Sequence, residues 1–380
     1  MNDSATAPLP HASLAAVLRA EPVAWNALGL SRDEWLDTCA AQDVTELVHQ
    51  RLCEHGDRSD WPADVRDAFA RLGYAAAARE LLRQRSIVSV LGALASAAIR
   101  PILLKGTPLA YSVYDVPSTR PRGDTDLFIP WDQVEASRLA MTALGYVPTV
   151  YCDGELLFHQ FEFGKTDDFG VDHAFDFHWK ISTQSVFADL LSYDELAADA
   201  VDVPALGPHA RAPGPPHALL VACVHPVMHH RNAATLLWIY DIHLLVSRLA
   251  AADLDCFIDL AIVKKVAAIT AQQLGLARSL FDTPIPDSAL ARLRASAMSE
   301  ASAAYLRPNR RWRDELASNI HGLPHWQGRI RLLREVLFPG RSYMVQSYGL
   351  TRGALGTAAL PALYLHRIVS GLWKVLLGRK

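Results

Sequence analysis

The chain has few cysteines, and they are scattered along the sequence. Its 380 residues include Cys39, Cys53, Cys152, Cys223 and Cys256, an odd number without a Cys-x-x-Cys pair. Disulfide frameworks and cysteine zinc sites both need closely patterned cysteines, and neither is indicated here. We therefore expect reduced thiols, as in a cytoplasm.

The sequence also lacks an excess of positive charge. Its formal net charge is -3, which excludes the overall basic footprint that drives sequence-independent binding of nucleic acids. A local basic patch on the surface is still compatible with this net charge. A small molecule, peptide or protein is therefore favoured over nucleic acid as a partner.

Long uninterrupted apolar runs are missing too. The segment MNDSATAPLPHAS at the start has no basic region followed by an apolar run, so no secretory signal is expected. The most apolar stretch, residues 355–380, is interrupted by Pro361 and by His366-Arg367, which argues against a transmembrane helix. We predict a core helix with a basic end there, with a membrane-surface role as the less favoured alternative, and a cytoplasmic protein.

What is abundant is apolar residues, at 51%, enough for a large core and two or three domains. Residues 12–95 have helical periodicity, and residues beyond 216 are again mainly helical in pattern. Between them, the Pro- and Gly-rich segment 203–216 is the clearest linker signal. We predict a helical N-terminal region over 1–95, an α/β core over 96–205 and a helical C-terminal domain over 206–380.

Short apolar runs and turn residues predict a small mixed β-sheet in the core, so the fold class is α+β. Thr107 is expected to be the N-cap of a helix, with Pro108 as its first residue. A second helix, over 131–144, should end at Gly145. The expected strands are 102–104, 122–130, 156–163 and 171–181.

The segment GDTDLFI carries the strongest chemical signal. Side chains alternate along a strand, so Asp124 and Asp126 share one face, with Cα atoms about 7 Å apart. Two carboxylates at that distance suit one or two divalent cations, and hard oxygen ligands favour Mg²⁺ or Mn²⁺. A lone Asp-x-Asp is often only a polar loop, but Leu127, Phe128 and Ile129 place this one at a buried strand.

Two-metal phosphoryl transfer calls for a third carboxylate. Asp176 is the best candidate, because it alternates with Phe175 and Phe177 on a strand that can pair beside the first one. Asp172 and Glu162 are weaker alternatives. His178 shares the face of Asp176, either as a general base or, more simply, as a packed histidine.

A phosphate site is expected where the first strand meets its helix. Gly106 allows close approach of the backbone, Thr107 offers a hydroxyl, and Lys105 supplies positive charge. Arg122 and Arg120 precede the acidic pair. Each of them either binds oxygens of the triphosphate or has a purely structural role. In the structural alternative Arg122 pairs with a nearby aspartate, and Arg120 is a solvent-exposed loop residue.

Two features of the helical C-terminal part also bear on the site. Asp241 falls on an apolar helical stripe and needs a partner, either Arg231 or a histidine of the preceding helix; alternatively it contacts nucleotide or acceptor. His225 and His229 have a spacing used in zinc sites, but Pro226 suggests that His225 lies at or before the start of the helix. A helix-terminal or cleft-lining role is preferred.

The segment LLKGTPLAYSVYDVPSTRPRGDTDLFI, followed by LGY, FDFHW and LLWIYDIHLL, resembles the uncharacterised bacterial nucleotidyltransferase family of the DNA polymerase β-like superfamily. The resemblance covers about residues 85–250, with a looser similarity at 337–348. It implies a minimal nucleotidyltransferase core. Gly106 and Thr107 match the family's Gly-Ser phosphate turn, with threonine as a departure; Asp124, Asp126 and Asp176 match its metal-binding carboxylates.

The resemblance implies Mg²⁺- or Mn²⁺-dependent transfer of a nucleoside monophosphate from a nucleoside triphosphate such as ATP to an unidentified acceptor hydroxyl or phosphate, with release of pyrophosphate. Two alternatives remain at this point. One is a protein of the same fold that senses nucleotide or binds a partner without catalysis. The other is kinase-like transfer of the γ-phosphate.

Overall fold

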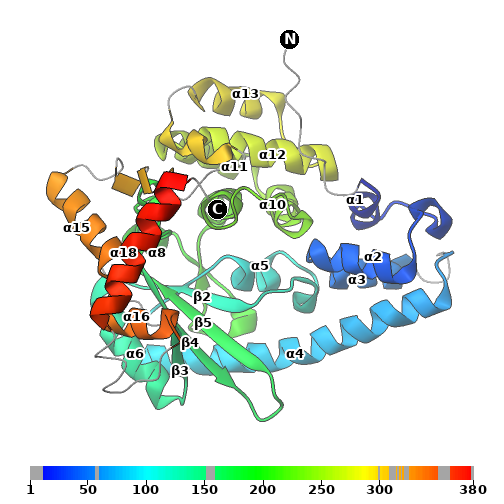
Figure 1. The fold of residues 1–380 in the computed structure, drawn as a ribbon. Coiled ribbons are helices and arrows are strands. Elements are labelled where there is room, and N and C mark those ends of the chain that lie inside the picture. The colour runs from blue at the N-terminus through cyan, green and yellow to red at the C-terminus, as the bar shows by residue number, and fades with distance from the viewer. Residues whose placement is uncertain are drawn as a thin grey trace.

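A five-stranded mixed sheet flanked by helices forms the centre of the protein (Figure 1). The computed structural model describes residues 12–55, 60–150, 159–297, 300–307, 325–349 and 360–377, together with 314, 316, 317, 319 and 320. The strands are β1 (Ile102–Leu104), β2 (Asp124–Phe128), β3 (Val147–Val150), β4 (Gln160–Thr166) and β5 (Asp172–His178). The predicted α+β class is confirmed.

The sheet order is β1-β2-β5-β4-β3. Only β2 and β5 run parallel to each other; the pairs β1–β2, β5–β4 and β4–β3 are antiparallel. The strand expected over 156–163 is displaced to β4, and residues 156–158 lie outside the described residues. Strand β3 was not predicted. The strand expected from Arg122 begins only at Asp124, so Arg122 does not lie on its face.

Helices precede the sheet in the chain, as predicted. They are α1 (Ala12–Leu18), η1 (Trp25–Leu28), α2 (Arg32–Ala41), α3 (Thr45–His55) and α4 (Ala63–Ser96). Ser31 and Glu34 form a capping box that fixes the start of α2. The 34-residue α4 is the longest helix described, and its second half lies along the sheet (Figure 1).

The helices between the strands are shorter. They are α5 (Gly106–Ser112), η3 (Pro117–Thr119), η4 (Trp131–Gln133), α6 (Val134–Ala143), α7 (Ser185–Ala188) and α8 (Tyr193–Ala198). Helix α6 confirms the helix predicted before Gly145, whose φ of +79° suits only glycine well. The start of α5 differs from the prediction. Lys105 occupies the N-cap position, and Thr107 is the second residue of the helix.

Alternating side chains divide the core between the two faces of the sheet. Leu103, Leu127 and Phe177 pack with α4 and α6 on one face. Ile102 and Phe128 belong to the larger core on the other face, which includes α5, α9 (Pro215–His229) and α10 (Leu236–Arg248). Because Asp124 and Asp126 alternate with Leu127, they point to the side of α5, α9 and α10.

The Pro- and Gly-rich segment 203–216 is a packed hairpin rather than an open linker. It follows β6 (Val201–Asp202) and contains η5 (Pro204–Leu206) and β7 (Arg211–Ala212), which pairs with β6; the side chains of Val203 and Leu206 are buried. Proline and glycine mark turns as readily as linkers, so the composition alone could not separate the two. The domain boundary placed there stays a prediction.

The remaining described elements are helical. They are α9 (Pro215–His229), α10 (Leu236–Arg248), α11 (Ala251–Val263), α12 (Ala267–Phe281), α13 (Asp287–Ser296), η7 (Ala301–Leu306), α15 (Trp326–Leu337), α16 (Arg341–Ser347) and α18 (Leu360–Leu377). Pro226 lies inside α9, so the expectation that His225 precedes this helix is wrong. In the described part of the chain, no helix combines the length and apolarity needed to cross a bilayer.

Candidate active site

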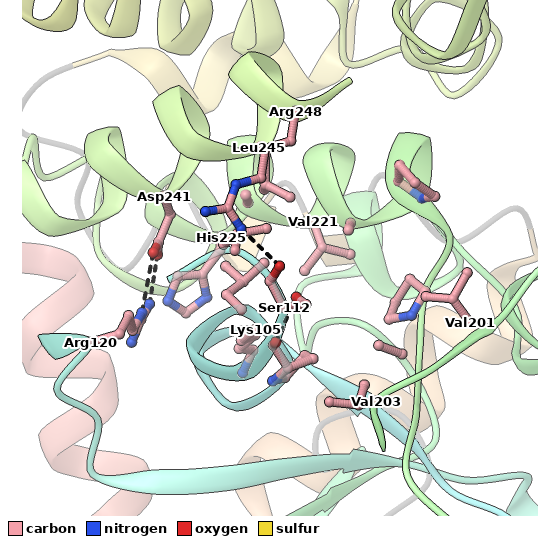
Figure 2. Close-up of a pocket in the computed structure, with 18 of the residues that line it drawn as sticks. Lys105, Ser112, Arg120, Val201, Val203, Val221, His225, Asp241, Leu245 and Arg248 are labelled. Carbon is pink, nitrogen blue, oxygen red and sulfur yellow. Dashed lines mark hydrogen bonds and ion pairs between the residues drawn. The ribbon is translucent and has the colours of Figure 1, made fainter. Parts of the chain in front are cut away.

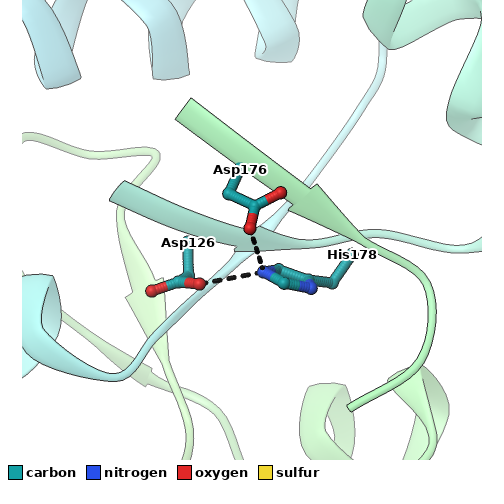
Figure 3. Close-up of side chains that lie close together, drawn as sticks. All are labelled: Asp126, Asp176 and His178. Atoms are coloured by element: carbon teal, nitrogen blue, oxygen red, sulfur yellow. Dashed lines mark hydrogen bonds and ion pairs between the residues drawn. The ribbon is translucent and has the colours of Figure 1, made fainter. Parts of the chain in front are cut away.

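Two aspartates from neighbouring strands lie side by side at the centre of the sheet. Asp126 of β2 is in direct register with Asp176 of β5 (Figure 3). Asp124 lies two residues before Asp126 on β2. The predicted pairing of the two strands is therefore confirmed. Asp126 and Asp176 are both buried, whereas Asp124 is half-buried at the start of its strand.

His178 joins these two aspartates. Its Nε2 atom lies 2.8 Å from Asp126 Oδ1 and 3.1 Å from Asp176 Oδ2 (Figure 3). Burial opposes a positive charge on the ring, but the charges of Asp176 and Asp126 outweigh burial and raise the pKa of His178 to about 9. The imidazole is therefore protonated at neutral pH and bridges the two carboxylates as a cation.

Lys105 provides the second positive charge. Its Nζ lies 2.6 Å from Asp126 Oδ1, and although burial opposes the charge, Asp126 raises the pKa of Lys105 above its ordinary value. Burial alone would raise the pKa of Asp126, but Lys105 and His178 hold it well below its usual range. Lys105 has φ +55°, ψ -128°, a strained backbone conformation for a side chain with a Cβ.

Three observations indicate that the cluster suits a divalent cation. Ligand atoms of Asp126, Asp176 and His178 all lie within 4.8 Å of one another, and the imidazole can be a ligand only after it has lost its proton. Asp176 Oδ1 is buried and has no hydrogen-bond partner in the described part of the chain, whereas Oδ2 accepts from Gln160 Nε2 at 3.0 Å. Burial and the neighbouring charge of Asp126 raise the pKa of Asp124 to about 6, so this carboxyl also lacks a sufficient counter-charge.

The other two candidates for the third carboxylate lie apart from this cluster. Asp172 is exposed at the far end of β5 and accepts a hydrogen bond from Thr166 Oγ1 at 2.6 Å. Glu162 is the cross-strand neighbour of Asp176 on β4, but its carboxylate accepts from Thr149 Oγ1 at 2.5 Å. Asp176 is the one that the fold places beside Asp126.

The Gly-Thr turn is built differently from the expectation. The Thr107 side chain is buried; its hydroxyl lies 3.3 Å from Thr125 Oγ1 and accepts from Arg122 Nε at 3.1 Å. Gly106 is needed for packing, because a Cβ there would lie 2.5 Å from Nη1 of Arg120. The backbone of this turn follows Lys105 directly, so it still lies next to the carboxylate cluster.

Arg122 is held by an ion pair that the sequence pattern did not reveal. Its Nη2 lies 2.6 Å from Oε1 of Glu80 on α4, and Tyr111 donates to the same oxygen. The Arg122 side chain is only 3% exposed. The expected pairing with an aspartate is therefore wrong. The partner is Glu80, which precedes Arg122 by 42 residues. Glu80 is buried, at a helix position where an apolar side chain is usual.

Asp241 also has a partner that was not anticipated. Arg120 donates to it from Nη2 at 2.7 Å and from Nε at 3.2 Å, and the Tyr114 hydroxyl donates at 2.7 Å. The expected partners of Asp241 were Arg231 and the histidines of α9. Arg120 was expected to be solvent-exposed if it did not bind the triphosphate. Both expectations are wrong, since Arg120 is buried and ties the segment before β2 to α10.

A mainly apolar cavity of about 230 Å³ lies between α5, α9, α10 and the β6–β7 hairpin (Figure 2). Lys105, Arg120, His225 and Asp241 are among its polar lining residues. Lys105 thus contributes to this cavity and, through Nζ, to the carboxylate cluster.

His225 of α9 forms part of the same wall. The His225 ring packs edge-on against Trp238 of α10, and the ring centroids of His225 and His229 are 5.5 Å apart. Burial, reinforced by the charge of Lys105, lowers the pKa of both and brings that of His229 to about 3. Neither belongs to the group of described residues that are close enough to share a metal ion. The place of His225 along the cavity agrees with the preferred cleft-lining role, and His229 is the last residue of α9.

The comparison with protein families agrees with this arrangement. The model of a family described as uncharacterised nucleotidyltransferase matches residues 30–282, which include the whole sheet and helices α2 to α12. The chain belongs to this family, and the resemblance seen in the sequence is confirmed. The looser similarity at 337–348 falls outside the match. No curated protein matches the chain.

Proposed function

We propose that the protein transfers a nucleoside monophosphate from a nucleoside triphosphate to an acceptor hydroxyl or phosphate, with release of pyrophosphate. The observation that supports this most is the register of Asp126 with Asp176 on the two parallel strands, with Asp124 on the same face. Membership of a nucleotidyltransferase family points to the same reaction class. The presence of free thiols at the described cysteines fits a cytoplasmic location.

In this proposal Asp124, Asp126 and Asp176 hold Mg²⁺ or Mn²⁺. The donor set is rich in carboxylate oxygens, and Asp176 Oδ1 has no hydrogen-bond partner among the described residues. Bound there, the divalent ion would neutralise phosphate charge and lower the pKa of an attacking hydroxyl. His178 is a positioning residue, because a protonated imidazole between two carboxylates orients them and cannot accept a proton.

Lys105 and the backbone of Gly106 and Thr107 are the proposed triphosphate contacts. The Lys105 ammonium lies at the cluster, where it would pair with a phosphate oxygen of a bound triphosphate in place of Asp126. Arg122 acts indirectly, through its hydrogen bond to Thr107 and its ion pair with Glu80. Asp241 lines the cavity and is a proposed contact of the nucleoside or the acceptor, for which it would exchange a hydrogen bond from Arg120 or Tyr114. We favour a small molecule, peptide or protein as acceptor.

The test is replacement of Asp126 by Asn. Its carboxylate receives both cationic side chains, so Asp126→Asn removes the charge that organises the cluster. We expect pyrophosphate release from Mg²⁺ and nucleoside triphosphates, assayed across acceptor pools, to fall at least about 100-fold. Asp172→Asn, an exposed carboxylate on the neighbouring strand, is the matched control and should retain full activity. Full activity in folded Asp126→Asn protein would refute the site.

A second candidate is nucleotide binding without turnover. It is favoured by the ion pair of Lys105 with Asp126, which balances the charge of this aspartate without a metal ion. Titration calorimetry with each nucleoside triphosphate and Mg²⁺ separates the two functions. Tight binding without pyrophosphate release, with every acceptor pool supplied, would favour the sensor.

A further inference from the structure

The C-terminal part of the chain differs sharply in charge from the rest. Residues 321–380 contain nine Lys and Arg against a single acid, Glu335, whereas the remaining residues contain 28 against 39. The net charge of -3 for the whole chain therefore conceals a strongly basic end on an acidic protein. The family match ends at residue 282, so this basic end is an addition to the part of the chain that defines the family.

Helix α15 (Trp326–Leu337) presents an apolar stripe to solvent. Trp326 is 67% exposed and Ile330 56%, and both Leu333 and Leu337 are exposed as well. At about 100° per residue, these four side chains fall within an arc of about 60°. Leu332, about 130° away from the centre of this arc, is the buried residue of the helix. The helix therefore faces the protein with Leu332 and turns its most apolar side outward.

Basic residues flank the stripe. Arg329 and Arg334 fall about 70° to either side of its centre, where long side chains can reach polar headgroups beside an apolar face. Helix α18 bonds to the end of α15 and to the residues that follow it. Arg367 Nε of α18 donates to the Val336 carbonyl at 3.0 Å, and the Tyr364 hydroxyl donates to the Pro339 carbonyl at 2.7 Å. In Figure 1 the helix lies at the left edge of the molecule, away from the long helix α4.

We propose that α15 docks on the surface of an anionic lipid membrane, lying in the interface without crossing it. A helix with an outward apolar stripe, basic flanks and an aromatic residue is the combination that binds there through burial of apolar side chains and attraction to anionic headgroups. The exposed Phe338 at the end of the helix, and Leu365 and Val369 on α18, extend the apolar surface. The proposal is independent of the nucleotidyltransferase reaction.

The test is flotation of the full chain with vesicles. We expect binding to vesicles that contain phosphatidylglycerol in phosphatidylcholine, and little binding to phosphatidylcholine alone. The variant Trp326→Ser/Ile330→Ser should bind at least about tenfold more weakly, since it removes two of the apolar side chains that would enter the interface. Leu139→Ser is the matched control, because Leu139 of α6 is 66% exposed and lies outside α15. It should bind like the unmodified protein.

A charge series completes the test. Arg334→Gln should weaken binding and reduce its dependence on salt, while Arg71→Gln, at an exposed arginine of α4, should change neither. Circular dichroism checks that each variant is folded. Three results would overturn the proposal: vesicle binding unchanged in Trp326→Ser/Ile330→Ser; binding of single-stranded RNA instead of vesicles; or a dimer in sedimentation velocity that this variant dissolves, with no vesicle binding.

Discussion

The buried ion pair between Arg120 and Asp241 should be one of the most sensitive points of the fold. Its side chains are 8% and 4% exposed, and Tyr114 donates a third hydrogen bond to the carboxylate. Asp241→Leu leaves a buried guanidinium without its counter-charge, which costs about 3–5 kcal/mol of unfolding free energy. Arg120→Met leaves the carboxylate with only Tyr114 and should cost a similar amount.

The double variant separates attraction from desolvation. In Arg120→Met/Asp241→Leu both charges are gone, so the remaining loss is mainly the Tyr114 hydroxyl without an acceptor, about 1–3 kcal/mol. Adding Tyr114→Phe should recover most of that loss. The double variant is thus expected to be more stable than either single variant, with a coupling energy of about 3 kcal/mol or more.

The assay is urea unfolding followed by tryptophan fluorescence and circular dichroism, with coincident transitions required before free energies are compared. The exposed pair of Arg292 and Asp259, at 2.6 Å, is the control. Asp259→Asn should cost less than about 1 kcal/mol, because surface pairs contribute little. A cost below about 1 kcal/mol for Asp241→Leu, or additive single and double variants, would refute the reasoning.

Two further changes probe the surroundings of the site. Gly106→Ala should lower the free energy of unfolding, measured in urea, by about 1–3 kcal/mol, because the new Cβ would meet the Arg120 guanidinium. Gly92→Ala is the control: a Cβ at Gly92 would have no atom within 4 Å, so this variant should stabilise α4 by up to about 1 kcal/mol. His229 is neutral in the folded protein because its pKa is lowered to about 3. Below about pH 6.5 the unfolded chain binds a proton at this histidine and the folded protein does not, so the contribution of His229 to the free energy of unfolding is fully present above about pH 6.5 and is lost as the pH falls toward 3. Between pH 7 and 5 the free energy of unfolding should therefore fall less steeply in His229→Gln than in the unmodified protein, by up to about 1.4 kcal/mol per pH unit. The same pH dependence in both proteins would contradict the neutral state of His229.

The carboxylate cluster could be predicted because strand geometry is local. Alternation places Asp124 with Asp126, and Asp176 with His178, whatever the rest of the fold does. Only the pairing of the two strands had to be added, and the apolar residues around each aspartate indicated it. The position of Lys105 at the end of the first strand brought it to the same place.

The ion pairs around the cluster could not be predicted in this way. Arg120 and Asp241 are 121 residues apart in the chain, and Arg122 and Glu80 are 42 apart. A buried charge on a helix shows that some partner is needed, but its identity depends on how α4 and α10 pack against the sheet. Helical periodicity gives the buried face of each helix and leaves that packing open.

The charges of the site would couple the proposed binding of a metal ion to the proposed binding of nucleotide. Asp124, Asp126 and Asp176 carry three negative charges when ionised, and Lys105 with the protonated His178 supplies two positive ones. The site therefore has a net charge of one negative unit. A divalent cation that binds without nucleotide is attracted by this single excess charge and is repelled by the Lys105 ammonium at Asp126. A triphosphate brings negative charge that attracts Lys105 away from the carboxylate. We therefore expect each ligand to tighten binding of the other, which calorimetric titration of Mn²⁺ with and without nucleotide measures, and the coupling should disappear in Lys105→Met.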